Sequence, residues 1–131
     1  DAAARVIPAQ SVGGDFYHLF KLEGERTGVM IGDVSGHGYQ AALIMALAMS
    51  AAAIHAQRTT DPARVLHDLV GSLRDELVST DMFFTVCYAV LDPRREQLRL
   101  ANLGHPHAFV VRADGRTERL VAQAPPIGLG D

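Results

Sequence analysis

The pattern of apolar and polar residues divides the chain into three parts. Two apolar runs lie within residues 16–33 on either side of the polar stretch Gly24-Glu25-Arg26, and this arrangement predicts an antiparallel hairpin. Residues 38–80 carry apolar residues at helical spacing, and from residue 82 onwards the period changes to two. A hairpin, two helices and an antiparallel meander in this order predict an α+β fold.

The two predicted helices differ in how apolar they are. The first, residues 38–57, is apolar almost throughout, so we expect it to be buried. The second follows Asp61-Pro62, a typical N-cap with proline at the first helical position, and its opposite face is polar. The apolar stripes are Leu43, Ile44, Leu47, Ala48, Ala51 and Ile54 in the first helix and Val65, Leu66, Leu69, Val70, Leu73 and Leu77 in the second.

Strands are predicted on both sides of the helices. Residues 5–9 read as a short edge strand interrupted by Pro8, and Asp92-Pro93 and Asp114-Gly115 mark tight turns between later strands. Both faces of the first hairpin are apolar, so we expect a helix layer on one side and a second sheet on the other. The predicted later strands are residues 82–91, 97–103, 108–112 and 117–121.

The first hairpin brings two aspartates together. Counting outward from its loop places Asp15 opposite Asp33 on one face, with their Cβ atoms roughly 4.5–5.5 Å apart. Two carboxylates this close repel each other unless a cation lies between them or one takes up a proton. The pair therefore favours a hard cation such as Mg²⁺ or Mn²⁺, and indicates a metal-dependent hydrolase or a binding site for a phosphorylated ligand.

Composition narrows the class of protein. The 131 residues suffice for one domain, and the net charge of -3 comes without a clustered basic face, which argues against nucleic-acid binding. A single cysteine, Cys87, indicates a reducing compartment. No signal peptide is visible, and the longest uncharged apolar run, residues 41–54, is shorter than the about 20 residues of a membrane span. We therefore expect a cytoplasmic protein without a membrane partner.

Other candidate motifs are weaker. Residues 36–41 match the dinucleotide fingerprint G-x-G-x-x-A, but a second helix follows where a parallel strand should stand. The six histidines lack zinc-ligand spacing; we expect His55 and His67 to be solvated, whereas His105 in Gly104-His105-Pro106 is either structural or functional. We expect Cys87 to lie in the core, and Ser35 lacks the context of a nucleophile elbow.

Four motifs follow one another along the chain: residues 12–17 (VGGDFY), 31–38 (IGDVSGHG) with 41–43 (AAL), 80–85 (TDMFFT) and 101–106 (ANLGHP). In this order they resemble the SpoIIE/RsbU-type branch of the metal-dependent protein phosphatases (protein phosphatase 2C-like). They span nearly the whole chain, so residues 1–131 are expected to form a single domain of this type. The resemblance implies an α-β-β-α sandwich of two antiparallel sheets flanked by helices.

The resemblance also implies a reaction and a site. Members of this branch remove phosphate from phosphoserine or phosphothreonine with two Mn²⁺ or Mg²⁺ ions. The family's metal ligands match Asp15, Asp33 and the backbone carbonyl of Val34. The catalytic group is a water bridging two metals about 3.5–4 Å apart, which attacks phosphorus in line.

Partners follow from the same resemblance. The usual substrate is a phosphorylated anti-anti-sigma (STAS-domain) protein in partner-switching control of a sigma factor. A sensor or receiver domain commonly precedes the phosphatase domain in the same polypeptide. The sequence leaves open whether the protein forms a homodimer. His18 stands where the family often has aspartate, and the family's remaining aspartate ligands lie beyond Gly128-Leu129. We therefore expect a domain incomplete at its C-terminus, with an inactive pseudophosphatase that binds its partner through the same face as the alternative.

Overall fold

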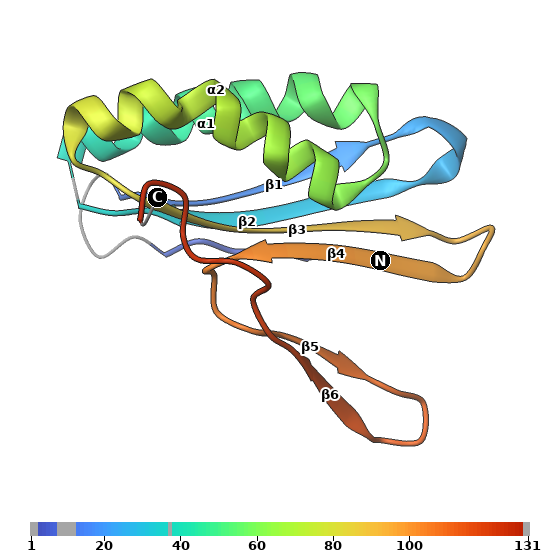
Figure 1. The fold of residues 1–131 in the computed structure, drawn as a ribbon. Coiled ribbons are helices and arrows are strands. Elements are labelled where there is room, and N and C mark those ends of the chain that lie inside the picture. Colours follow the sequence, from blue (N-terminus) through green and yellow to red (C-terminus); the bar gives the residue numbers. More distant parts are fainter. Residues whose placement is uncertain (1–2, 8–12, 37, 130–131) are drawn as a thin grey trace.

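The fold is a four-stranded antiparallel sheet with two helices on one face and a separate hairpin below it (Figure 1). The computed structural model describes residues 3–7, 13–36 and 38–129. The sheet has the strand order β1-β2-β3-β4, and β5 pairs only with β6. The elements are β1 (Asp15–Lys21), the 3₁₀ turn η1 (Glu23–Glu25), β2 (Thr27–Val34), α1 (Gly38–Arg58), α2 (Pro62–Thr80), β3 (Phe84–Asp92), β4 (Gln97–Leu103), β5 (Ala108–Val111) and β6 (Thr117–Leu120).

The first hairpin has the predicted register. β1 pairs with β2 antiparallel, and Asp15 is the partner of Asp33. Its loop includes Gly24 at φ +69°, a left-handed conformation that glycine adopts without a steric penalty. Because side chains alternate across a strand, this register sends Phe16, Phe20 and Met30 to the helix side and the two aspartates to the opposite face.

The helix layer buries the core on the first of these faces. Asp61 caps α2 as predicted, since its side chain accepts a hydrogen bond from the Ala63 N–H at 3.1 Å. The predicted apolar stripe of α2 faces the sheet, where five of its six residues are buried and Val70 is partly buried. Phe20 and Tyr88 meet edge to face at 5.7 Å under the helices, and Phe16 stacks on Phe84 at 5.8 Å.

The prediction for α1 was right about the helix and only half right about its inner face, because Ile44, Ala48 and Ala51 of the predicted stripe lie in or against the core. Its buried residues are Ala41, Ile44, Ala48, Ala52 and Ala56, whereas Leu43, Leu47 and Ile54 are 64%, 41% and 62% exposed. A helix that is apolar all round gives no signal for choosing its inner face. The alanine stripe is the inner one because small side chains let the helix pack closely on the sheet and on α2.

The second face of the sheet is open in the residues that the structure describes. Tyr17, Leu19 and Ile31 are 37%, 42% and 47% exposed, so the predicted second sheet does not cover them. The hairpin β5–β6 is the second antiparallel sheet of the chain, but it projects away below β4 (Figure 1). The described residues therefore leave an apolar face of the sheet exposed, which is unusual for a folded domain.

The prediction of an edge strand at residues 5–9 was wrong for its described part. Residues 5–7 have no strand conformation, and residues 8 and 9 lie outside the described residues. Ile7 is 72% exposed and Val6 is only half-buried, so this run gains little apolar burial that would hold it against the sheet. The later strands match their predicted positions within two residues at each end.

The chain after β6 returns to the sheet and completes the end that carries Asp33. Phe84 and Ile127 exchange two backbone hydrogen bonds, of 2.9 and 2.8 Å. Gly104, at φ +66°, forms a bridge with Val86, and its N–H donates to the Ala124 carbonyl at 2.8 Å. Pro126 lies against Gly104 so closely that a Cβ there would overlap its ring. The start of β3 is therefore flanked on both sides, by β2 and by this returning segment.

Candidate functional site

Two carboxylates face each other at the end of the first hairpin. Asp15 begins β1 and Asp33 is the last residue but one of β2, and the register makes them direct partners on the open face of the sheet. The pKa of Asp33 is raised, first by partial burial of its carboxylate and second by the negative charge of Asp15. The structure thus confirms that the pair converges, and among the described residues neither carboxylate forms an ion pair.

A backbone oxygen joins the two carboxylates because residue 14 is glycine. The Val34 N–H donates to the Gly14 carbonyl at 3.2 Å, which draws the two backbones together. A Cβ at Gly14 would overlap the Val34 carbonyl oxygen and would lie 3.0 Å from Asp33 Oδ1. Only a residue without a side chain allows the Val34 carbonyl oxygen and Asp33 Oδ1 to approach residue 14 this closely. Oxygen ligands of this kind suit Mg²⁺ or Mn²⁺.

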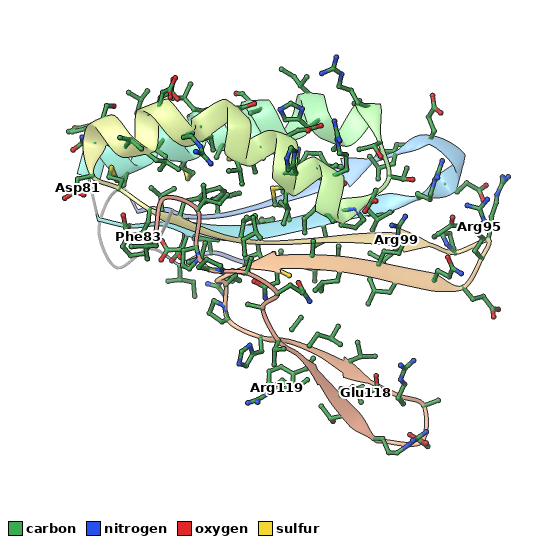
Figure 2. All side chains as sticks on the ribbon, viewed as in Figure 1. Asp81, Phe83, Arg95, Arg99, Glu118 and Arg119 are labelled. Carbon is green, nitrogen blue, oxygen red and sulfur yellow. The ribbon has the colours of Figure 1, made fainter. Side chains whose placement is uncertain are left out.

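The loop that follows Asp33 is fixed to the start of β3. Ser35 donates its N–H to the Phe83 carbonyl at 2.8 Å, and its Oγ accepts the Phe83 N–H at 2.8 Å. Figure 2 shows Phe83 and Asp81 close to the point where α2 leads into β3. Asp81 ends α2 in a left-handed conformation at φ +53°. Ser35 is therefore a structural anchor for the loop, a role that its sequence context did not reveal.

The row of polar side chains continues across the sheet to a histidine. Thr85 of β3 is the partner of Asp33, so its side chain lies on the same face. Thr85 Oγ1 lies 2.8 Å from His105 Nδ1 and 3.5 Å from the Asp33 carbonyl oxygen. Burial lowers the pKa of His105, and the nearby charge of Asp15 raises it to a smaller extent. The sequence left the role of His105 open, and the structure places it beside the aspartates.

The backbone of His105 is held by a buried amide. Asn102 is fully buried, and its Oδ1 accepts the His105 N–H at 2.8 Å. Its Nδ2 donates to the carbonyls of His105 and Pro106, at 3.0 and 3.4 Å. The Asn102 N–H donates to Gln123 Oε1 at 2.8 Å, which ties this turn to the returning segment. Three hydrogen bonds from one buried side chain fix the conformation of the turn.

The other singled-out residues lie away from this row. His18 is on the helix side of β1, 4.5 Å from the Phe20 ring, so it does not contact the aspartates' face. His55 was predicted to be solvated, and this prediction was wrong. The residue is half-buried, and its Nε2 lies 2.9 Å from Ser72 Oγ of α2. His67 is exposed as predicted. Cys87 is buried, which raises the pKa of its thiol to about 11.

The donors at the aspartate pair are fewer than a dinuclear site needs. Within residues 3–7, 13–36 and 38–129, no group of three or more His, Cys, Asp and Glu side chains is arranged to hold a metal ion. The pair and the Val34 carbonyl supply two carboxylates and one carbonyl, whereas Mg²⁺ prefers six oxygen ligands, several of them waters. The geometry thus fits one side of a cation site.

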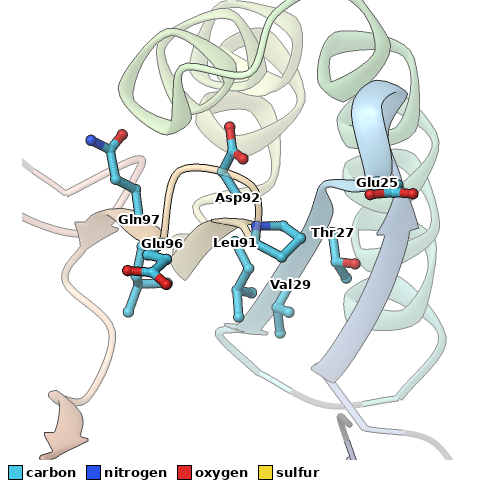
Figure 3. A pocket seen from close by; sticks show the side chains of 9 residues that line it. Glu25, Thr27, Val29, Leu91, Asp92, Glu96 and Gln97 are labelled. Carbon is cyan, nitrogen blue, oxygen red and sulfur yellow. The ribbon is translucent and has the colours of Figure 1, made fainter.

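A hollow of about 490 Å³ lies on the same face but at the other end of the strands (Figure 3). Its apolar floor is made by Val29, Leu91 and Leu98. Asp33 is six residues along β2 from Thr27 at the rim of the hollow, which is about 20 Å at strand spacing. The hollow is therefore part of the uncovered apolar face and separate from the aspartate pair.

Comparison with known proteins decides the family. Residues 23–131 match the family model of Stage II sporulation protein E (SpoIIE). The chain belongs to the SpoIIE family. This match covers most of the chain and includes Asp33, Thr85 and His105, and it confirms the family that the four motifs indicated.

Two relatives of the chain are named phosphoserine phosphatases of Bacillus subtilis (strain 168). The chain is 32% identical over 109 residues to phosphoserine phosphatase RsbU and 30% identical over 127 residues to phosphoserine phosphatase RsbP. These alignments cover 83% and 92% of the chain, but only 32% and 31% of the relatives. The chain thus spans about a third of the length of these curated relatives.

The fold also agrees with a solved phosphatase domain. The SiaA-PP2C domain of Pseudomonas aeruginosa superimposes with a TM-score of 0.76 at 29% sequence identity, and the match covers 92% of this chain and 48% of that one. The α+β fold with two antiparallel sheets and flanking helices is therefore that of the PP2C-type domains. The chain corresponds to about half of the SiaA-PP2C chain.

Proposed function

We propose that this chain is part of a metal-dependent phosphoprotein phosphatase that acts on phosphoserine or phosphothreonine. The observation that carries the proposal is the convergence of Asp15, Asp33 and the Val34 carbonyl at the end of one hairpin in a SpoIIE-family chain. Two of its relatives bear the name phosphoserine phosphatase. The whole protein's activity is inferred from this combination of donor set and family.

The donor set fits a divalent cation. The carboxylates carry a charge that no described cationic side chain balances, since the structure gives neither Asp15 nor Asp33 an ion pair among the described residues. The absence of a side chain at Gly14 lets the Val34 carbonyl oxygen and the Asp33 carboxylate both lie close to this residue. When bound, Mn²⁺ or Mg²⁺ supplies Lewis-acid activation of water and neutralises charge on the phosphoryl oxygens. The chain's own part is to orient the cation and to hold it on a rigid strand end.

The proposed substrate is a phosphorylated anti-anti-sigma regulator of the STAS type, in partner-switching signalling. The aspartate pair lies on the exposed face of the sheet, where the phosphorylated side chain of a folded protein can reach it. Phosphate carried on a protein needs a shallow, accessible site, and both aspartates are exposed. A sensor or receiver domain in the same polypeptide would provide the regulatory input, and we place the protein in the cytoplasm.

The experiment measures phosphate release by the full-length protein from a phosphoserine-bearing STAS-domain protein, with and without Mn²⁺. We expect Mn²⁺-dependent release by the wild type and a loss of several orders of magnitude in Asp33→Asn, because the amide keeps the shape of the side chain and removes its charge. Asp75→Asn on the exposed side of α2 is the matched control and should retain wild-type turnover. Unchanged turnover in Asp33→Asn would show that the hairpin is not the site.

A regulatory pseudophosphatase is the second candidate. It is favoured by the small donor set, two carboxylates and a carbonyl among the described residues. Such a module would bind its phosphorylated partner through the same face without hydrolysing it. Calorimetric titration of the full-length protein with Mn²⁺ separates the two functions, because an inactive site should bind no cation in the micromolar range whereas the enzyme should.

A further inference from the structure

His105 is held at three points, which is more than a turn on the surface needs. Its N–H and its carbonyl are both hydrogen-bonded by the fully buried Asn102, at 2.8 and 3.0 Å. Its ring is fixed by the 2.8 Å contact between Nδ1 and Thr85 Oγ1. The positions of both the backbone and the imidazole are therefore set by groups that belong to the sheet.

The second ring nitrogen has no partner in the part of the chain that the structure describes. Nδ1 contacts Thr85, and no hydrogen bond is made by Nε2 to any described residue. The Thr85 hydroxyl has one proton, and its contact with Nδ1 is shorter than its contact with the Asp33 carbonyl, 2.8 against 3.5 Å. A hydroxyl that donates to Nδ1 leaves the proton of the neutral ring on Nε2, which is then a hydrogen-bond donor.

This donor lies beyond Thr85, at the end of the row of polar side chains that begins with the aspartate pair. Asp15, Asp33 and Thr85 follow one another across three neighbouring strands, which lie about 4.8 Å apart. The ring, which lies beyond Thr85, is therefore more than one strand spacing from Asp33 and more than two from Asp15. A cation held by the pair and a phosphoryl group bound to that cation would together extend from the carboxylates towards the imidazole. Burial favours the neutral ring, since it lowers the pKa of His105 more than the charge of Asp15 raises it.

We propose that His105 binds the phosphoryl group of the substrate by donating a hydrogen bond from Nε2, with Asn102 and Thr85 as the positioning residues that hold its ring. This inference rests on the phosphatase function proposed above and adds a substrate-binding residue to it. A neutral donor recognises a phosphoryl oxygen without competing with the cation for the carboxylates. His105 would thus contribute to phosphate binding and not to metal binding.

Two amide substitutions separate this role from a structural one. Asparagine can place its amide where Nδ1 stands and keep the contact with Thr85, whereas glutamine can reach the position of Nε2. If Nε2 binds phosphate, His105→Gln retains activity and His105→Asn does not. If the ring serves only to hold Thr85 in place, His105→Asn retains activity and His105→Gln does not. His107→Ala, an exposed histidine two residues further on, is the matched control.

The test uses the full-length protein loaded with Mn²⁺ and a phosphorylated STAS-domain substrate. We expect His105→Ala to lower kcat/KM about 10²-fold, the size of effect seen when one preorganised donor is removed, while the Kd for Mn²⁺ stays within about twofold. His105→Gln should recover most of this loss, and His107→Ala should equal the wild type. Asn102→Ala should add no further loss in the His105→Ala background, since it acts through the same ring.

A binding measurement keeps the outcome independent of turnover. Inorganic phosphate titrated into the Mn²⁺-loaded protein should bind about tenfold more weakly to His105→Ala and normally to His107→Ala. Equal phosphate affinity in wild type and His105→Ala, a parallel loss of Mn²⁺ affinity, or recovery by Asn instead of Gln would overturn the proposal. If the wild type binds phosphate through His105 but releases none from the phosphoprotein, the proposed function fails and this inference stands.

Discussion

The repulsion between Asp15 and Asp33 predicts that an inactivating substitution stabilises the metal-free protein. Asp33→Asn removes one of two opposed charges. Two unit charges about 4 Å apart in water repel each other by about 1 kcal/mol. Both side chains are classed as exposed although the Asp33 carboxylate is partly shielded, and we use the value for water because the accessible surface dominates the screening. We therefore expect Asp33→Asn to raise the free energy of unfolding by about 0.5–1 kcal/mol, or the melting temperature by about 1–4 °C.

With Mn²⁺ present, the wild type should become more stable than Asp33→Asn. At a concentration one hundred times its Kd, a ligand that binds only the folded state stabilises it by about 2.7 kcal/mol. The wild type should gain this amount, and Asp33→Asn should gain none because it lacks the charge that holds the cation. The assay is thermal unfolding of chelator-stripped protein with and without Mn²⁺, with Asp75→Asn as the charge-matched control on α2, for which we expect wild-type behaviour in both conditions.

The difference in stability between the metal-free wild type and Asp33→Asn should depend on pH with a defined sign. The pKa of Asp33 is higher in the folded protein than in the unfolded chain, so the folded state keeps this proton to higher pH. The stability of the metal-free wild type should therefore fall as the pH rises through the interval between the two pKa values, and the advantage of Asp33→Asn should vanish below about pH 4. An Asp33→Asn variant that is less stable without metal, or that gains as much from Mn²⁺ as the wild type, would refute the reasoning.

Three further predictions concern particular residues. Gly14→Ala should weaken Mn²⁺ binding at least about tenfold in calorimetry, because its Cβ would overlap the Val34 carbonyl oxygen, whereas Gly71→Ala, which meets no atom within 4 Å, should not. Cys87 should stay unmodified by maleimide at pH 7.5 until the protein unfolds, because burial raises its pKa to about 11; rapid labelling of the folded protein would contradict this. Asp61→Ala should lower the free energy of unfolding in denaturant by about 1 kcal/mol through loss of the α2 cap, and an unchanged midpoint would show that the cap contributes nothing.

The parts of the site that could be predicted depend on local geometry. The register of the first hairpin follows from the length of its loop, and it was enough to place Asp15 opposite Asp33. The start of α2 was equally local, since Asp61 and Pro62 provide a cap within the first turn. In both places a few neighbouring residues carry the whole signal.

The parts that were missed depend on contacts between distant segments. The inner face of α1 could not be chosen because leucine and alanine are both apolar, and only packing shows that Ala48 faces inward and Leu47 outward. The position of His105 depends on a contact with Thr85, 20 residues earlier, across the β3–β4 pairing. The signal that could have indicated it was Asn102 three residues before, an amide able to close the turn.

The position of the cation is the most direct test of the account. Crystals of the full-length protein grown with Mn²⁺ and measured at the manganese absorption edge would locate it by anomalous scattering. We predict a peak within coordination distance of the Asp33 carboxylate, the Asp15 carboxylate and the Val34 carbonyl oxygen, absent in Asp33→Asn. A Mn²⁺ peak elsewhere in the protein, or none at this hairpin in a protein that releases phosphate, would contradict the assignment.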